Sequence, residues 1–293
     1  MRRIPYVTVD VFAERPLEGN PLAVVPDASA LSDREMLAVA REFNLSETTF
    51  VLRRERSVER AEGIRTRIFS TQEEMPFAGH PTLGTAAVLR QSGEGPEVML
   101  QLNVGRVPVR FSGRDGREFG EMTQVEPTFG TVHDREQVAE ALGLPPGEIV
   151  ADLPVETVST GVPFAIVPIG RLSTLQAWVP EWPRMERYLR RTDARFFYLV
   201  CRETLAPEAN VHARMAFYGG DDPATGSAAG PAAAWLVRHG EVPSGGPVEI
   251  EQGLEAGRPS RLSARAVQHG EKVTDVRVGG YFAPVGQGEL RLG

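Results

Sequence analysis

Apolar and polar residues alternate along many short segments of the chain, which is the pattern of β-strands with one buried face. Residues that favour turns lie between these segments. In the first half the pattern predicts strands at residues 6–12, 21–25, 64–69, 98–109 and 121–125. In the second half it predicts strands at residues 156–160, 164–168, 195–201, 211–217, 248–251, 261–266 and 273–278, and a hairpin-like pair between 281 and 292.

Apolar residues at helical spacing occur in fewer places. Residues 32–35, Ser-Asp-Arg-Glu, have the capping-box pattern, and the apolar residues at positions 36, 37, 40 and 43 form one stripe of a helix. The chain then leaves this helix and enters a strand, so that Glu47 lies at the junction. Further helices are predicted at residues 135–142 and, broken by Pro180 and Pro183, at residues 178–191.

Two stretches of the chain resemble each other and divide it into halves. Residues 75–89 and 222–236 each read as a turn that leads into an alanine-rich helix, with Gly79 aligned on Gly226. These helices carry almost no charge, so we expect other elements to enclose them. Residues 19–26 and 161–168 form a second related pair, in the same order and at nearly the same spacing. The repeat predicts two homologous lobes, residues 1–127 and 128–280, each a curved and largely antiparallel sheet around a central helix. For the last strands, residues 281–293, a return to the first lobe stays open.

Composition narrows the classes of partner. The chain has 293 residues, and its 32 Lys and Arg against 39 Asp and Glu give a net charge of −7, which argues against nucleic acid as the main partner. No apolar run approaches the roughly 20 residues of a membrane span, and the first residues do not form a signal peptide. We therefore expect a soluble, cytoplasmic protein. The chain has one cysteine, Cys201, so it cannot form an intramolecular disulfide. Because Cys201 lies in an apolar run, we expect a buried thiol.

The repeated turns carry the candidate chemistry. In each half a glycine and a polar residue, Gly79-His80 and Gly226-Ser227, come at the start of the enclosed helix. The free N–H groups and the dipole of a helix start attract anions. If the halves face each other, the two helix starts converge on one cleft that also carries Asp222, and this cleft would suit a small carboxylate substrate.

Several alternatives limit these assignments. His80 and Asp222 could each serve only the local turn, and Glu47 could be a surface acid at the edge of a strand. The other histidines, at positions 133, 212, 239 and 269, lack the spacing of metal ligands, so no metal is expected. Ser-His-Asp hydrolysis stays open by residue types, although Ser227 does not lie in a Gly-x-Ser-x-Gly elbow. A dinucleotide or nucleotide triphosphate site has no support, because neither a Gly-x-Gly-x-x-Gly fingerprint nor a P-loop occurs.

Six blocks of this sequence together resemble the PhzF-like phenazine-biosynthesis family. They are residues 9–12 (Val-Asp-Val-Phe), 19–21 (Gly-Asn-Pro), 44–50 (Asn-Leu-Ser-Glu-Thr-Thr-Phe), 76–84 (Pro-Phe-Ala-Gly-His-Pro-Thr-Leu-Gly), 159–163 (Ser-Thr-Gly-Val-Pro) and 222–228 (Asp-Pro-Ala-Thr-Gly-Ser-Ala). The resemblance covers most of the chain. It implies an α+β fold like that of diaminopimelate epimerase, with two pseudo-symmetric lobes that each form a strand barrel around a central helix, and usually a homodimer.

The resemblance also implies a reaction. Epimerases of the related fold use two cysteines at the helix starts, and here those positions resemble Ala78 and Thr225. What remains is a PhzF-like isomerase without a cofactor, in which Glu47 moves a proton on a small amino- or hydroxy-carboxylate. His80, Asp222 and Ser227 would assist, and Gly79, Thr225 and Gly226 would bind the substrate. A racemase or epimerase with bases other than thiols, and a ligand-binding protein without catalysis, are the alternatives.

Overall fold

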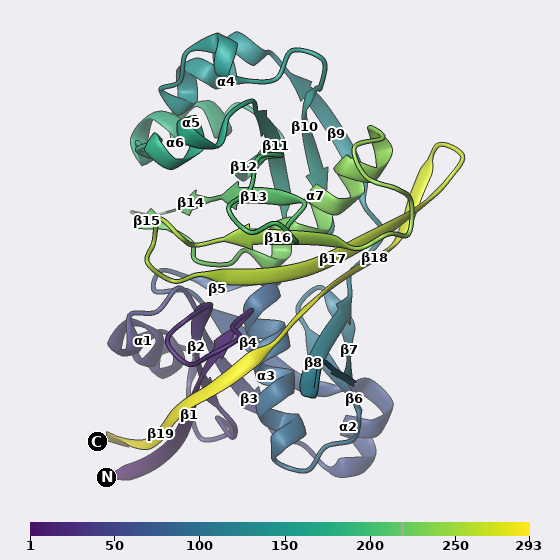
Figure 1. Ribbon diagram of the computed structural model, residues 1–293. Coiled ribbons are helices and arrows are strands. Elements are labelled where there is room, and N and C mark those ends of the chain that lie inside the picture. The colour runs from purple at the N-terminus through teal and green to yellow at the C-terminus, as the bar shows by residue number, and fades with distance from the viewer. Residues whose placement is uncertain (218–219) are drawn as a thin grey trace. The chain divides into compact units, whose positions relative to one another are not determined.

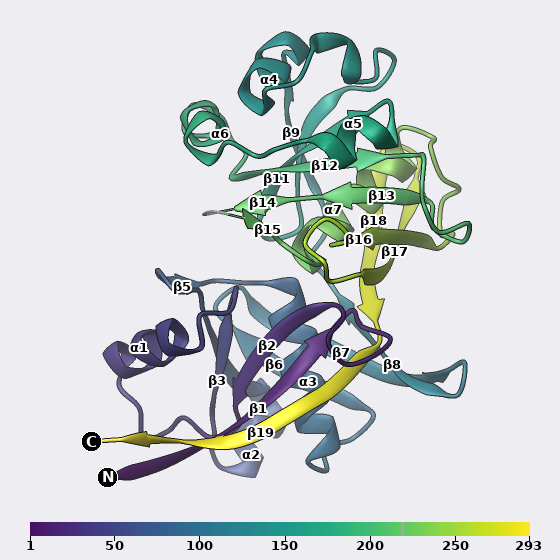
Figure 2. The ribbon, with the colours of Figure 1, turned by 60° about the vertical axis from the view of Figure 1, so that its left-hand side comes forward.

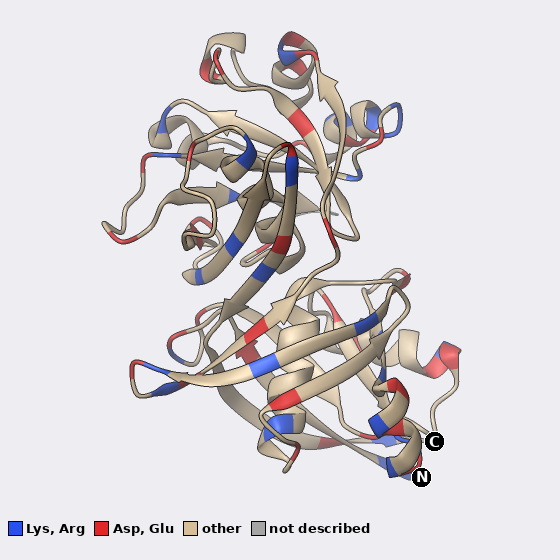
Figure 3. Cartoon of the chain, turned by 90° about the vertical axis from the view of Figure 1, so that its right-hand side faces the viewer, with Lys and Arg blue, Asp and Glu red and all other residues tan. Residues whose placement is uncertain are grey.

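The computed structural model describes residues 1–217 and 220–293, which form two compact units (Figure 1). Unit 1 comprises Met1–Thr123 and Gly279–Gly293, and unit 2 comprises Gln124–Val278. Acidic and basic residues are interspersed along the elements of both units (Figure 3). Among the described residues, no helix combines the length and the apolar character needed to span a bilayer.

Unit 1 is a curved sheet with a helix in its centre and short helices outside. Its strands are β1 (Arg2–Val11), β2 (Asn20–Val25), β3 (Thr48–Leu52), β4 (Ile64–Phe69), β5 (Glu74–Met75), β6 (Glu97–Leu102), β7 (Gly105–Arg114), β8 (Arg117–Thr123) and β19 (Phe282–Leu292). Its helices are α1 (Asp33–Phe43), α2 (Arg56–Glu62) and α3 (Gly79–Gln91). Most neighbouring strands are antiparallel, whereas β2–β3 and β4–β6 are parallel.

The central helix α3 has almost no exposed side. Every residue from Gly79 to Leu89 is buried, and the helix contacts strands β1, β2, β3, β6, β7 and β8. Gly84 allows this close packing, because a Cβ there would lie 2.6 Å from Leu22 Cδ2 and 2.7 Å from Val11 Cγ2. The enclosure expected from the lack of charge is therefore confirmed.

The outer face of the sheet in unit 1 is covered by α1. Its predicted capping box is present, because the Ser32 side chain accepts from the Glu35 N–H and the Glu35 side chain accepts from the Ser32 N–H. Met36, Val39 and Ala40 pack with buried side chains of β2, β3 and β4. Since neighbouring residues of a strand point to opposite faces, β3 contacts α1 with one set of side chains and α3 with the other.

Unit 2 has the same plan. Its strands are β9 (Thr128–His133), β10 (Val155–Ser159), β11 (Pro163–Ile169), β12 (Phe196–Cys201), β13 (Val211–Arg214), β14 (Ala216–Phe217), β15 (Gly220–Asp221), β16 (Val248–Gln252), β17 (Ser260–His269) and β18 (Lys272–Gly280). Its helices are α4 (Arg135–Leu142), the 3₁₀ turn η1 (Pro146–Glu148), α5 (Leu172–Ala177), α6 (Trp182–Leu189) and α7 (Gly226–Arg238). Helices α4, α5 and α6 cover one face of β11 and β12, and α7 contacts the sheet from the other (Figure 2).

The internal repeat reappears in the order of strand pairs. Along β1, β2, β3, β4, β6 and β7 the pairs alternate antiparallel, parallel, antiparallel, parallel, antiparallel. Along β10, β11, β12, β13, β16 and β17 they alternate in the same way. In each unit the central helix lies between the fourth and fifth of these strands in the chain. Each unit is therefore a copy of one α+β plan, as the sequence repeat indicated.

Four predicted elements need correction. The strand predicted at residues 211–217 is two strands, because β13 ends at Arg214 and β14 begins at Ala216. Residues 98–109 form parts of two strands, because β6 ends at Leu102 and β7 begins at Gly105. The helix predicted at 178–191 begins only at Trp182, because Pro183 lies in its first turn, where proline is well tolerated. The hairpin predicted between 281 and 292 is the single strand β19, paired antiparallel with β1. Within this strand Gly288 makes room for the Tyr6 ring, since a Cβ would lie 2.7 Å from the Tyr6 hydroxyl.

Candidate functional site

Glu47 lies between helix α1 and strand β3 of unit 1. Asn44 ends α1 in the left-handed conformation, with φ 50°, and four residues later the chain enters β3 at Thr48. The side chain of Glu47 is only 11% exposed. The sequence therefore turns a carboxyl group inward at the end of a strand that packs on the central helix.

His80 is the second residue of α3 and faces this carboxyl group. Its Nε2 lies 3.5 Å from Glu47 Oε2, and its side chain is 4% exposed. Burial lowers the pKa of His80 to about 3, so the imidazole is neutral at physiological pH. The pair is therefore a carboxyl group beside a neutral ring that can donate or accept one hydrogen bond at Nε2.

Threonine hydroxyls connect strand β3 with helix α3. Thr49 follows Glu47 by two residues, and the Thr85 hydroxyl lies 2.8 Å from its Oγ1 and 2.7 Å from the Pro81 carbonyl oxygen. Thr49 and Thr85 are both fully buried. The contact holds β3 against α3 and thereby sets the position of Glu47 relative to His80.

The starts of α3 and α7 have the same character. The residues that precede them, Ala78 and Thr225, make no side-chain hydrogen bond to the first turn among the residues the structure describes. The first N–H groups of both helices are therefore open to an acceptor from outside the helix, which is the usual setting for anion binding.

In unit 2 the turn before α7 is built around Asp222 and Thr225. The Asp222 N–H donates to the Met215 carbonyl oxygen at 2.8 Å, and the Thr225 hydroxyl donates to Asp222 Oδ2 at 2.7 Å. Asp222, Thr225 and Ser227 are buried. Ser227 is the second residue of α7, the position that His80 occupies in α3.

A buried glutamine organises this turn. Gln252 Nε2 donates to the Asp222 carbonyl oxygen at 2.7 Å and to Thr225 Oγ1 at 2.8 Å. Its Oε1 accepts from the Tyr198 hydroxyl at 3.0 Å and from the Thr225 N–H at 3.2 Å. Burial, with the nearby charge of Asp222, raises the pKa of Tyr198, which therefore remains a hydrogen-bond donor. All four hydrogen-bonding positions of the Gln252 amide are used.

Arg214 fixes the residue before Asp222. Its guanidinium group holds both carboxylate oxygens of Asp221, with Nη2 distances of 2.9 and 2.8 Å, and also donates to the carbonyl oxygens of Leu175 and Trp178. Gly253 completes the packing, because a Cβ at that position, with φ +80°, would lie 2.4 Å from the Pro223 carbonyl oxygen. The turn that carries Asp222 is thus held from two sides.

Sequence reasoning found the candidate residues but missed their supports. Tyr198 lies on a predicted strand and Gln252 directly follows one, both far along the chain from Asp222, and no local pattern links them to it. A polar residue directly before a glycine at the end of an apolar strand was the only available signal for Gln252. Thr49 and Thr85 lie within the quoted motifs, but their contact depends on the fold.

Cys201 and His212, to which the sequence analysis gave no catalytic role, are both buried. Cys201 is buried, and burial raises the pKa of its thiol. His212 is fully buried between Glu251 and Glu255, with nitrogen to oxygen distances of 2.8 and 3.0 Å. Within residues 1–217 and 220–293, no three His, Cys, Asp or Glu side chains gather as they would around a metal ion.

Comparison with known proteins gives the family. The profile of the family described as "Phenazine biosynthesis-like protein" matches residues 9–288. An uncharacterised isomerase from Mesorhizobium japonicum is 39% identical, over 97% of this chain and 98% of the relative. Trans-2,3-dihydro-3-hydroxyanthranilate isomerase from Pseudomonas aeruginosa is 37% identical, over 98% of this chain and 99% of that enzyme.

Comparison with solved structures supports the same family and gives the fold. A phenazine biosynthesis protein of the PhzF family from Bacillus anthracis matches with a TM-score of 0.87 and 26% identity over the whole of both chains. A hydroxyproline epimerase from Agrobacterium vitis, 13% identical, shares the fold with a TM-score of 0.67 over 99% of this chain and 91% of that one. The α+β fold of the diaminopimelate epimerase type is thus confirmed. This chain belongs to the PhzF family of phenazine biosynthesis-like proteins, and it is an isomerase.

Proposed function

We propose that the protein moves a proton on a small amino- or hydroxy-carboxylate without a cofactor, with Glu47 as general acid and base. One observation carries the proposal: the nearly buried carboxyl group of Glu47 lies 3.5 Å from the neutral ring of His80, at an uncapped helix start. A positioned carboxylate can accept a proton from a substrate carbon and return it, which typically accelerates a reaction by about 10²–10⁴-fold.

The proposed step conserves all atoms and electrons. Glu47 takes a proton from a C–H bond next to an unsaturated group, and the electron pair of that bond forms a shifted double bond. The protonated carboxyl group then gives the proton to another carbon of the same molecule. Substrate and product have the same oxidation state, so the residues of the chain suffice.

The helix starts would hold the substrate. The first N–H groups of α3, at Gly79, and of α7, at Gly226, can donate to a carboxylate. We propose that His80 binds the amine or hydroxyl group that sets which carbon faces Glu47. In unit 2 we propose a substrate-binding or catalytic role for Asp222, Thr225 and Ser227 as well, which the sequence repeat and the equivalent positions of His80 and Ser227 in their helices support.

The names of the relatives suggest the first test compound. Trans-2,3-dihydro-3-hydroxyanthranilate is the substrate named for the Pseudomonas aeruginosa relative, and it carries a carboxylate, an amine and a hydroxyl group. We propose a substrate of this class, a small ring or chain with an acid and an amino or hydroxyl group.

The test is solvent deuterium uptake, followed by NMR, with this compound and a panel of cyclic and acyclic carboxylates. Glu47→Gln should keep ligand binding and lose exchange by at least about 100-fold, because the amide cannot accept the proton. Glu59→Gln is a matched control, since Glu59 is also a buried glutamate of unit 1 but accepts from the Arg54 N–H.

Each outcome has a clear meaning. Undiminished exchange in Glu47→Gln removes Glu47 from the mechanism. Exchange with inversion at one stereocentre, and no shift of a double bond, identifies a racemase or epimerase. Binding without any exchange by the wild type identifies a ligand-binding protein. A homodimer is proposed from the family resemblance, and a cytoplasmic location from the sequence pattern described above. Light scattering of the purified protein would give the number of subunits.

A further inference from the structure

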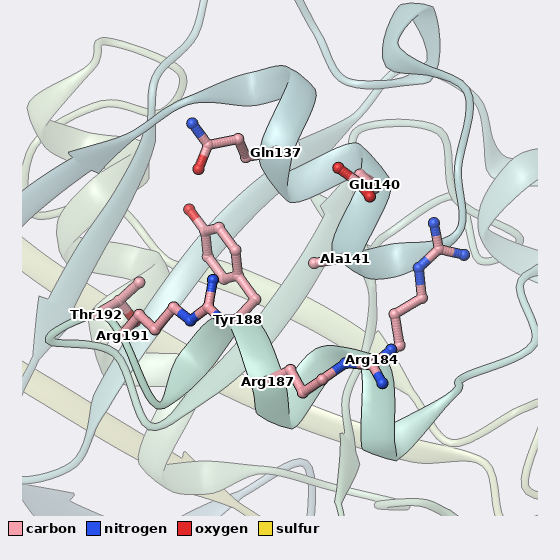
Figure 4. A pocket seen from close by; sticks show the side chains of 8 residues that line it. All are labelled: Gln137, Glu140, Ala141, Arg184, Arg187, Tyr188, Arg191 and Thr192. Atoms are coloured by element: carbon pink, nitrogen blue, oxygen red, sulfur yellow. The ribbon is translucent and has the colours of Figure 1, made fainter.

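A groove in unit 2 lies between helix α4 on one side and helix α6 with the turn after it on the other (Figure 4). Its volume is about 330 Å³, which is within the range of small-molecule sites. We call it the arginine groove and define it by Gln137, Glu140, Arg184, Arg187, Tyr188 and Arg191. None of these residues belongs to the candidate site at the helix starts.

Three unneutralised guanidinium groups line this groove. Arg184, Arg187 and Arg191 follow one another at helical spacing, and none of their side chains has a hydrogen bond or ion pair within the described part of the chain. Arg190, on the same segment but outside the groove, pairs with Glu186 at 3.0 Å. Against three positive charges the lining offers one carboxylate, Glu140, on a chain whose net charge is −7.

The helix dipole does not explain this cluster fully. A basic residue near the end of a helix is favourable, and this accounts for Arg187 and Arg191. Arg184, however, lies in the first turn of α6, where a positive charge is unfavourable, and like charges at this spacing repel one another. An anion bound in the groove would relieve both costs.

Tyr188 adds a second kind of contact. Its hydroxyl lies 3.0 Å from Nδ1 of the buried His133, whose Nε2 lies 2.7 Å from Thr157 Oγ1. The Thr157 hydroxyl donates to Asp193 Oδ1 at 2.8 Å. Thr157 must therefore accept from His133 Nε2–H. Burial lowers the pKa of His133 and so favours the neutral ring, in which Nδ1 accepts from Tyr188. The Tyr188 hydroxyl hydrogen is thus engaged, and its oxygen can only accept further hydrogen bonds.

The groove therefore offers donors on its arginines and acceptors on Tyr188 and Glu140. The Tyr188 ring is held in place, since it stacks on Phe197 with ring centroids 5.7 Å apart. Guanidinium groups bind phosphate with paired hydrogen bonds, and the acceptors suit the hydroxyl groups of a ligand. We propose that the arginine groove binds a small phosphorylated molecule that also carries hydroxyl groups, such as a sugar phosphate or a nucleoside monophosphate.

Isothermal titration of the full chain with ribose 5-phosphate, AMP and inorganic phosphate tests this. Ribose 5-phosphate or AMP should bind the wild type, and Arg187→Ala should weaken binding by at least about tenfold. Arg187→Lys, which keeps the charge but loses the paired geometry, should recover only part of the affinity. Arg190→Ala removes the same charge from the same segment outside the groove, so it should bind within about twofold of the wild type.

Tyr188→Phe separates the two parts of the proposal. It should weaken binding of ribose 5-phosphate and leave inorganic phosphate unchanged, because only the former carries hydroxyl groups for the tyrosine oxygen. Equal losses in Arg187→Ala and Arg190→Ala, or no binding of any of the three compounds to the wild type, overturn the site. Inorganic phosphate binding as tightly as ribose 5-phosphate overturns the role given to the hydroxyl groups. Thermal melts monitored by circular dichroism verify that each variant is folded.

Discussion

Replacing Gln252 with leucine should damage unit 2 more than its modest change in volume suggests. The side chain is fully buried, and its amide makes hydrogen bonds to Asp222, Thr225 and Tyr198. Leucine fills similar space but can neither donate nor accept a hydrogen bond. It leaves the Tyr198 hydroxyl, the Thr225 N–H and the Asp222 carbonyl oxygen without the amide.

The magnitude follows from these three groups. A buried polar group that loses its partner costs about 1–3 kcal/mol. With partial relaxation of the turn, we expect Gln252→Leu to lower the free energy of unfolding by about 3–6 kcal/mol, a large part of the roughly 5–15 kcal/mol typical of a folded protein.

Urea unfolding followed by tryptophan fluorescence measures this loss. The three tryptophans of the chain, Trp178, Trp182 and Trp235, all lie in unit 2, so the signal reports the unit that contains Gln252. Tyr198→Phe is the control, since it removes one hydroxyl and should cost about 1 kcal/mol.

A double-mutant cycle tests the reasoning itself. In Gln252→Leu the Tyr198 hydroxyl is stranded, so adding Tyr198→Phe should recover stability rather than reduce it further. Additive losses, or a smaller cost for Gln252→Leu than for Tyr198→Phe, would refute the network as the cause. Deuterium uptake by the same variant shows whether the turn also matters for turnover.

Two further predictions follow from the described contacts. Burial lowers the pKa of His212, but its hydrogen bonds to Glu255 and Glu251 outweigh this and raise the pKa above its usual value. Protonation therefore stabilises the fold below the unfolded pKa, and this stability is lost as the pH rises through the folded pKa. The urea midpoint of the wild type should accordingly fall as the pH rises above about 6.5, and His212→Gln should flatten this dependence. An equally steep fall in the variant would contradict the assignment. Thr49→Val should cost about 0.5–1.5 kcal/mol and lower turnover, because it releases β3 from Thr85. Thr82→Val is the matched control, since the buried Thr82 hydroxyl donates to the carbonyl oxygen of Ala78, the residue that precedes α3, and to no strand among the described residues. A similar loss of turnover in Thr82→Val would contradict the role given to Thr49.

Local chemistry made much of the fold predictable. The capping box at Ser32 and Glu35 and the left-handed Asn44 are encoded by neighbouring residues, so α1 and the junction at Glu47 were correctly predicted. The enclosure of the central helix α3 followed from its almost complete lack of charge. Errors arose where one residue type serves two purposes or where a strand pairs with a distant part of the chain. Pro183 lies in the first turn of a helix instead of breaking one, and the predicted hairpin at residues 281–292 is one strand that pairs with β1 at the other end of the chain.

The candidate site was predictable only in part, because some of its contacts join residues that are far apart in the sequence. Repetition within the chain drew attention to Gly79, His80, Gly226 and Ser227, since equivalent positions in two copies are visible in one sequence. The partners that hold them, Thr85 on Thr49 and Gln252 on Asp222, meet only through the fold. Long-range hydrogen bonds have no period or spacing, so the sequence alone did not indicate them.

The pairing of β1 with β19 determines the order in which the chain can fold as it is synthesised. Arg2 lies opposite Leu292, and the ladder continues to Val11 opposite Phe282. Unit 2 is one continuous segment and has all its residues as soon as position 278 leaves the ribosome, whereas unit 1 waits for its last strand. Until then the edge of β1 on the side away from β2 is open and available to other chains. A nascent or truncated chain should therefore aggregate through its first strand even while its later half is already folded.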